Sequence, residues 1–151
     1  MKKIKAAVVG YGDRGSVYAS YSFKRPEELE IVAIVDPLEY KLQYFGAMHH
    51  IPENRLFTDL DEFLNANIDC DVVINATMDQ MHYQTAIKII DKGYNILLEK
   101  PITSNKDELI EIERKAKEKG SMLFVCHVMR YSPYYVQIKK FIETGVLGEI
   151  F

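Results

Sequence analysis

Six short apolar runs recur along the chain, and all but the third, which has two residues, have the length of a typical β-strand. The second run is rich in β-branched residues, and few polar residues interrupt any of the six. Runs of this kind are typical of strands that are buried on both faces, as in a parallel sheet. The predicted strands cover residues Ile4–Val9, Ile31–Val35, Leu56–Phe57, Val72–Ala76, Ile96–Leu98 and Met122–Cys126.

Segments with helical spacing of apolar residues lie between the runs, and this alternation predicts a doubly wound α/β fold with a mainly parallel sheet. We expect helices over residues 16–24, 38–48, 59–64, 82–92, 104–119 and 133–144. The expected buried stripes are Leu38, Leu42, Phe45 and Met48 in the second helix and Leu109, Ile112 and Ala116 in the fifth. Ser104 is the expected N-cap of the fifth helix, and Gly120 its terminator.

A glycine-rich loop follows the first run at once. Gly10, Gly12 and Gly15 stand in the pattern G-x-G-x-x-G, with Asp13 and Arg14 between the last two. Asp36 ends the second apolar run about 20 residues further on. A strand, a glycine turn, a helix, a second strand and an acid form the fingerprint of a dinucleotide-binding unit, or Rossmann fold. The alternative is an ordinary βαβ turn that contains glycines.

The chemistry of a dinucleotide explains the residue types in this loop. Unpaired N–H groups at the start of a helix can hold a pyrophosphate. The first glycine allows a tight turn, the second lets the backbone approach phosphate, and the third lets helix and strand pack closely. Asp36 would accept hydrogen bonds from the adenosine ribose, and its charge would repel a 2′-phosphate. Because no Lys or Arg follows before Lys41, the sequence favours NAD over NADP.

Composition narrows the range of partners and locations. The chain has 151 residues, 48% of them apolar, and a net charge of −3, which argues against nucleic acid or an anionic membrane as partner. No apolar stretch approaches the roughly 20 residues of a membrane span, and the start shows no signal peptide. Cys70 and Cys126 are too few for a disulfide framework, so we expect buried thiols and a cytoplasmic protein.

Two more polar motifs follow predicted strands, at the ends where open α/β sheets bind ligands. One is residues 76–82, Ala-Thr-Met-Asp-Gln-Met-His, and the other is Glu99-Lys100-Pro101. Together with the glycine loop and Asp36, they resemble in order and spacing the N-terminal domain of the Gfo/Idh/MocA oxidoreductase family. Residues 145–150, Gly-Val-Leu-Gly-Glu-Ile, resemble the junction at which the second domain of that family starts.

The resemblance implies a dehydrogenase that moves hydride between a nicotinamide cofactor and a sugar, polyol or related small molecule. In the family the lysine of the Glu-Lys-Pro motif is catalytic, so this role falls on Lys100, which would polarise the substrate oxygen. The bond before Pro101 is often cis in the family. The residues expected at the cofactor, NAD rather than NADP, are Gly10, Gly12, Asp13, Arg14, Gly15, Asp36, Thr77, His82, Glu99 and Lys100. No metal site is expected.

The resemblance also implies how the chain is divided. Residues 1–145 would form the dinucleotide-binding domain, and residues 146–151 would begin a new strand of a second, α+β domain that the chain lacks. That domain supplies most substrate contacts and usually a downstream histidine, so we expect the chain alone to bind NAD without turning over substrate. The full-length protein is expected to be a homo-oligomer.

Several alternatives remain open from the sequence. Asp13-Arg14-Gly15 loosely matches the loop of NAD-dependent glycoside hydrolases of the same superfamily, and a non-catalytic NAD-sensing regulator could share the fold. Thr77 could be a simple helix cap, and His82 a packing residue. His49 and its neighbour His50 look like half a metal site but have no further ligand at suitable spacing, so a solvated helix end is favoured.

Overall fold

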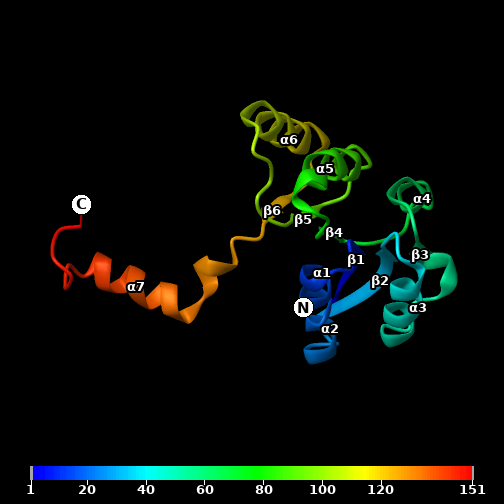
Figure 1. Ribbon diagram of the computed structural model, residues 1–151, viewed down its shortest axis with the longest axis horizontal. Coiled ribbons are helices and arrows are strands. Elements are labelled where there is room, and N and C mark those ends of the chain that lie inside the picture. Colours follow the sequence, from blue (N-terminus) through cyan, green and yellow to red (C-terminus); the bar gives the residue numbers. More distant parts are fainter. Residues whose placement is uncertain (1, 151) are drawn as a thin grey trace.

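A six-stranded parallel sheet forms the centre of the molecule in the computed structural model, which describes residues 2–150 (Figure 1). The strand order is β3-β2-β1-β4-β5-β6, and every neighbouring pair is parallel. The strands are β1 (Ile4–Val9), β2 (Leu29–Val35), β3 (Leu56–Phe57), β4 (Val72–Asn75), β5 (Ile96–Leu98) and β6 (Leu123–Val125). The predicted doubly wound α/β fold is confirmed, because the order reverses direction between β1 and β4.

At least one helix follows each strand. The helices are α1 (Asp13–Ala19), α2 (Tyr21–Lys24), α3 (Glu39–Met48), α4 (Leu60–Asn65), α5 (His82–Asp91), α6 (Lys106–Lys119) and α7 (Pro133–Glu143). Short 3₁₀ turns cover Glu53–Arg55, Asp79–Met81 and Val128–Tyr131. Local chemistry sets several ends: the side chain of Asp59 accepts the first N–H groups of α4, and Gly120 ends α6 in the left-handed conformation.

The core lies in two layers, one on each face of the sheet. On one face, α4, α5 and α6 pack Phe63, Ile89 and Ile112 against the strands, and all three side chains are fully buried. On the other face, Ala19 of α1 and Leu42 of α3 close over β1 and β2. Figure 1 shows the sheet between these groups of helices. Covering the sheet on both faces leaves the carboxyl ends of the strands free to form a site.

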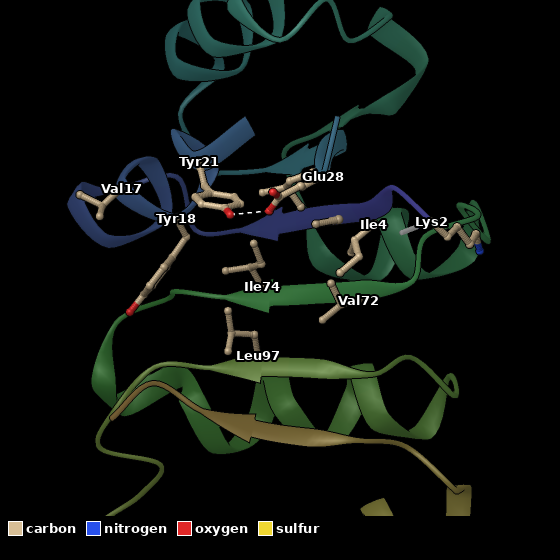
Figure 2. Close-up of a pocket in the computed structure, with 11 residues that line it drawn as sticks. Lys2, Ile4, Val17, Tyr18, Tyr21, Glu28, Val72, Ile74 and Leu97 are labelled. Atoms are coloured by element: carbon tan, nitrogen blue, oxygen red, sulfur yellow. Dashed lines mark hydrogen bonds between the residues drawn. The ribbon is translucent and has the colours of Figure 1, made fainter. Parts of the chain in front are cut away.

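One part of the second face carries an apolar hollow of about 460 Å³ (Figure 2). Ile4, Val72, Ile74 and Leu97 form its floor, and Tyr18 and Tyr21 stand at its rim, where Tyr21 donates a hydrogen bond to Glu28. This hollow lies over β1, β4 and β5, away from the carboxyl ends of the strands. It is therefore separate from the candidate site described below.

Some predicted helix details are wrong. Asn105, and not Ser104, caps α6 with its side chain, because the helix begins one residue later than expected. The buried stripe of α6 includes Ile112 and Ala116, while Leu109 is 43% exposed. At α3, the predicted Leu42 is buried and Phe45 packs against the same core cluster, but Leu38, the N-cap, and Met48 are exposed. The helix predicted over residues 16–24 is divided between α1 and α2 at Ser20.

The end of the chain also differs from the prediction. Helix α7 forms as expected and projects away from the sheet (Figure 1). Residues 146–150 form turns and irregular backbone where a strand was predicted, and Phe151 lies outside the described residues. No strand among residues 2–150 pairs with this segment, and an unpaired segment has no ladder of hydrogen bonds to hold it as a strand. The predicted division at residue 145 stays a prediction.

Two further observations concern residues 2–150. No helix among them has both the length and the apolar character that crossing a bilayer requires. Within the same range, no group of three or more His, Cys, Asp or Glu side chains is placed to hold a metal ion. Cys126 is buried and Cys70 is half-buried, both as free thiols.

Candidate dinucleotide-binding site

A cleft of about 590 Å³ opens at the carboxyl ends of β1, β2 and β4. The fold brings six of the ten predicted site residues to its lining, and these are Gly10, Gly12, Asp13, Arg14, Asp36 and Thr77. Lys41, Thr58, Met81 and Thr85 complete the wall with apolar neighbours. The cleft lies at the point where the strand order reverses, which is where doubly wound sheets bind ligands.

The three glycines of the loop differ in what surrounds them. Gly10 has a φ of +85°, and a Cβ there would lie 2.6 Å from the carbonyl oxygen of Ala76. A Cβ on Gly15 would lie 2.1 Å from the carbonyl oxygen of Gly10, so α1 packs directly against the loop. Gly12, in contrast, has no heavy atom within 4 Å of that position. Packing thus requires glycine at positions 10 and 15, while Gly12 leaves open space in front of the helix.

Asp36 is almost fully buried at the end of β2, yet its carboxylate lines the cleft. Oδ2 accepts a hydrogen bond of 2.9 Å from the backbone N–H of Tyr11, which ties the acid to the glycine loop. Oδ1 accepts the N–H of Leu38 at 3.1 Å. The ammonium of Lys41, one turn into α3, lies 3.3 Å from Oδ2. The carboxylate therefore has a fixed position beside the loop, as a ribose-binding acid requires.

Thr77 is held in place by a buried amide at the end of β4. The Oδ1 atom of Asn75 accepts a hydrogen bond from the Thr77 hydroxyl at 2.9 Å. Its amide nitrogen donates to the hydroxyl of Thr85 at 2.7 Å. Asn75 is fully buried, and these bonds compensate for the cost of removing its amide from water. Sequence reasoning missed Asn75 because it ends an otherwise apolar run; a buried polar residue at a strand end was the available signal.

The ring of His82 lies behind the cleft, where it is fully buried. Its Nδ1 atom is 2.6 Å from the carbonyl oxygen of Pro101, and its Nε2 atom is 3.0 Å from that of Thr77. A neutral imidazole donates through one of these nitrogens in either tautomer. The ring thus lies between the segments that follow β4 and β5, and as a neutral imidazole it donates to only one of the two carbonyls. It is absent from the residues that line the cleft.

Glu99 is a second buried carboxylate, at the end of β5. Its Oε1 atom accepts a hydrogen bond from the phenol of Tyr18, and the Nε atom of Arg14 lies 3.7 Å from the same oxygen. Its Oε2 atom accepts the backbone N–H of Lys100 at 2.8 Å. Burial raises the pKa of Tyr18, and hydrogen bonds with Cys126 and Glu99 raise it further, so the phenol keeps its proton and remains a donor.

Lys100 follows directly and is exposed to solvent. Its side chain is thus available to a bound molecule, while its backbone is fixed by Glu99. The Lys100–Pro101 peptide bond is cis, as the resemblance implied. The Glu-Lys-Pro segment lies beside the glycine loop, because Arg14 borders both the cleft and Glu99.

The described residues fit a dinucleotide. The open space in front of Gly12 is next to the first N–H groups of α1, where a pyrophosphate can be bound. The buried Asp36 has acceptor capacity left for a ribose hydroxyl, since a carboxylate offers about four acceptor positions and three are used here. Apolar side chains such as Leu38 and Leu60 can cover an adenine ring.

His49 has a structural role, while the neighbouring His50 is exposed to solvent as predicted. The ring of His49 stacks on Phe23 with a centroid distance of 4.4 Å, and its Nε2 atom lies 2.6 Å from the hydroxyl of Tyr11. Burial lowers the pKa of His49 to about 4, with a smaller effect from His50. His49 is therefore a neutral packing residue near pH 7 rather than a solvated one.

Comparison with known proteins gives a family match over most of the chain. Residues 4–127 match the family model GFO_IDH_MocA, described as an oxidoreductase family with an NAD-binding Rossmann fold. The crystal structure of the WlbA dehydrogenase from Bordetella pertussis, in complex with NADH and UDP-GlcNAcA, is similar to 99% of this chain. The TM-score is 0.87 and the identity 27%, and the match covers 44% of that protein.

Curated relatives match the chain along nearly its whole length. A scyllo-inositol 2-dehydrogenase (NADP(+)) of Bacillus subtilis is 29% identical over 97% of the chain and 39% of its own length. A 2,7-anhydro-N-acetylneuraminate hydratase of Mediterraneibacter gnavus is 31% identical over 99% of the chain and 38% of its own length. The chain thus spans about two fifths of the length of these relatives.

Proposed function

We propose that the whole protein transfers hydride between a nicotinamide cofactor and a sugar, polyol or related small molecule, since this chain belongs to the Gfo/Idh/MocA oxidoreductase family and forms its NAD-binding domain. The observation that carries the proposal is the meeting of three strand ends in one cleft. The glycine loop, Asp36 and Thr77 come from β1, β2 and β4 and line the same space.

The proposed cofactor contacts follow from the geometry of the cleft. The backbone from Gly12 to Arg14 binds the pyrophosphate, and Asp36 accepts a hydrogen bond from the adenosine ribose. Thr77 borders the cleft, with its hydroxyl already directed by Asn75. His82 and Gly15 do not line the cleft; they contact the backbone of Thr77 and Gly10, respectively, and so help to position the cofactor-binding residues.

Lys100 is the proposed catalytic residue. A nicotinamide cofactor, when bound, supplies a carbon that accepts or gives a hydride. The ammonium of Lys100 would hold the reacting substrate oxygen and take part in proton transfer as an alcohol becomes a ketone. Glu99 accepts the backbone N–H of Lys100 at 2.8 Å and so fixes the backbone position from which the lysine side chain extends.

The relatives support a polyhydroxylated substrate. The Bacillus protein is named for scyllo-inositol, the Mediterraneibacter protein for an anhydro sugar acid, and the Bordetella structure contains a sugar nucleotide. They also span both cofactors, since the first is named for NADP(+) and the last was solved with NADH. None of these names supports a glycoside hydrolase or a non-catalytic regulator.

Two measurements test the proposal. Titration with NADH should enhance nicotinamide fluorescence, and the absence of binding at millimolar cofactor would contradict a dinucleotide site. In the full-length protein, Lys100→Ala should abolish turnover of sugars and polyols while NADH still binds. Unchanged turnover in that variant would remove Lys100 from the mechanism and leave the cofactor site intact.

A further inference from the structure

Lys41 occupies a position at the cleft that the sequence did not suggest. It follows Asp36 by five residues, and because it lies in the first turn of α3 its side chain reaches the carboxylate of Asp36. The two groups are 3.3 Å apart, and the Lys41 side chain is 22% exposed, on the wall of the cleft. A cation therefore lies beside the acid that is expected to receive the adenosine ribose.

The hydrogen bonds of Asp36 show what this cation does. Oδ2 accepts from Tyr11 and from Lys41, so both of its acceptor positions are used. Oδ1 accepts from Leu38 and keeps one position. A ribose that offers two hydroxyls to this carboxylate needs a second position, and only the departure of the Lys41 ammonium provides one. Lys41 thus competes with an unmodified ribose for Oδ2.

The opposite holds for a ribose that carries a 2′-phosphate. Asp36 alone would repel the phosphate, but an ammonium within 3.3 Å of the carboxylate offsets that repulsion and can donate to the phosphate. The other cation among the described residues of the cleft wall, Arg14, lies beside Glu99. The nearby carboxylate of Asp59 accepts N–H groups of its own helix, α4. Lys41 is thus the cation at the ribose end.

We propose that Lys41 determines cofactor selectivity by letting the cleft accept the 2′-phosphate of NADP beside Asp36, so that the protein binds both NADP and NAD. This inference rests on the proposed cofactor site and adds a specificity residue to it. In this proposal the two oxygens of Asp36 have different partners. Oδ1 accepts a hydrogen bond from the ribose of either cofactor, and Oδ2 accepts from Lys41 and so positions its ammonium for the 2′-phosphate.

The test compares dissociation constants for NADH and NADPH, measured by fluorescence titration at constant salt. The variants are Lys41→Met, which removes the charge, and Lys41→Arg, which keeps it. Lys115→Met is the matched control, because Lys115 is also 22% exposed and is paired with a carboxylate, Asp91, at 2.8 Å on α5. Both methionine variants therefore lose one paired cation of equal exposure.

Wild-type protein should bind NADPH within about tenfold of NADH. Lys41→Met should weaken NADPH binding by about tenfold or more, since one hydrogen bond to a charged group is lost, and should tighten NADH binding, since the competing ammonium is gone. Lys41→Arg and Lys115→Met should keep the wild-type ratio. The inference is overturned if wild type binds NADH alone, if Lys41→Met weakens both cofactors equally, or if Lys115→Met shifts the ratio as strongly. Failure of wild type to bind either cofactor would overturn the cofactor site itself.

Discussion

The phenol of Tyr18 on α1 donates a hydrogen bond to the buried carboxylate of Glu99 at the end of β5, although 81 positions separate them in the sequence. The same carboxylate accepts the backbone N–H of Lys100 and lies near Arg14. One acidic side chain thus joins the helix that follows the glycine loop to the segment that carries the proposed catalytic lysine. The relative position of cofactor loop and lysine depends on this contact.

Removing that phenol should therefore affect both stability and turnover. Tyr18→Phe leaves a buried carboxylate with one donor fewer, and we expect the free energy of unfolding to fall by about 1–3 kcal/mol. Turnover in the full-length protein should fall as well, since Glu99 no longer holds Lys100 from a fixed position. Urea denaturation and steady-state kinetics measure the two effects.

Tyr21→Phe is the matched control for this variant. Tyr21 is the third residue after Tyr18, and its phenol donates to the exposed Glu28 at 2.5 Å. A solvated pair contributes little, so stability should change by less than about 0.5 kcal/mol. Equal losses in the two variants would show that Glu99 does not depend on the buried bond.

The glycine loop yields a second prediction, because Gly12 and Gly15 differ in their surroundings. Gly15→Ala places a Cβ 2.1 Å from a backbone oxygen and should destabilise the protein by about 3 kcal/mol, as overpacking does. Gly12→Ala meets nothing within 4 Å and has no positive φ, so unfolding should change by less than about 0.5 kcal/mol.

Cofactor binding should separate the two variants in the opposite sense: Gly12→Ala, which keeps its stability, should lose NADH affinity directly. Gly12→Ala puts a methyl group where phosphate approaches the backbone, and NADH should bind at least about tenfold more weakly to a fully folded protein. Thermal denaturation and NADH titration separate these effects. Normal NADH affinity in Gly12→Ala would mean that the pyrophosphate lies elsewhere.

The local motifs were predictable from the sequence, and the contacts between them were not. A strand, a glycine turn and an acid have fixed spacing, so the positions of Gly10, Gly12 and Asp36 along the chain were enough to assign them to one site. The contact between Lys41 and Asp36 depends on where α3 begins, and helix ends are poorly fixed by sequence. The bond from Tyr18 to Glu99 depends on packing between distant segments, which no local pattern encodes.

Errors of one residue had a similar origin. Ser104 and Asn105 can both cap a helix, and it is the side chain of Asn105 that accepts the N–H of Asp107. The position of His82 after β4 was visible in the sequence, but its contact with the carbonyl of Pro101, 19 positions later, was not.

A third prediction concerns His82 as the link between two strand ends. His82→Ala removes a fully buried ring and the one N–H that a neutral imidazole donates to the carbonyl of Thr77 or Pro101. We expect the free energy of unfolding to fall by about 2–4 kcal/mol, from the cavity and the lost hydrogen bond together. His127→Ala, at an exposed histidine after β6, should change it by less than about 0.5 kcal/mol. Equal stability of the two variants would contradict the linking role.

The last prediction concerns pH and follows from the burial of His49, whose pKa is lowered from 6.5 to about 4 in the folded protein. Below pH 6.5 the unfolded chain binds a proton at this residue that the folded protein does not bind until about pH 4. The free energy of unfolding contributed by His49 is therefore complete above pH 6.5 and is lost as the pH falls toward 4. Because the ring is only half-buried, we expect a loss of about 1 kcal/mol.

His49→Gln isolates this contribution from that of the carboxylates, which titrate in the same range. The glutamine can still accept the hydroxyl of Tyr11 but binds no proton, so its stability should fall less steeply between pH 6.5 and 4 than that of the wild type. Urea denaturation at several pH values gives both slopes. Parallel slopes for wild type and His49→Gln would show that this histidine is protonated in the folded protein as readily as in the unfolded chain, and that the stacking on Phe23 does not exclude the charge.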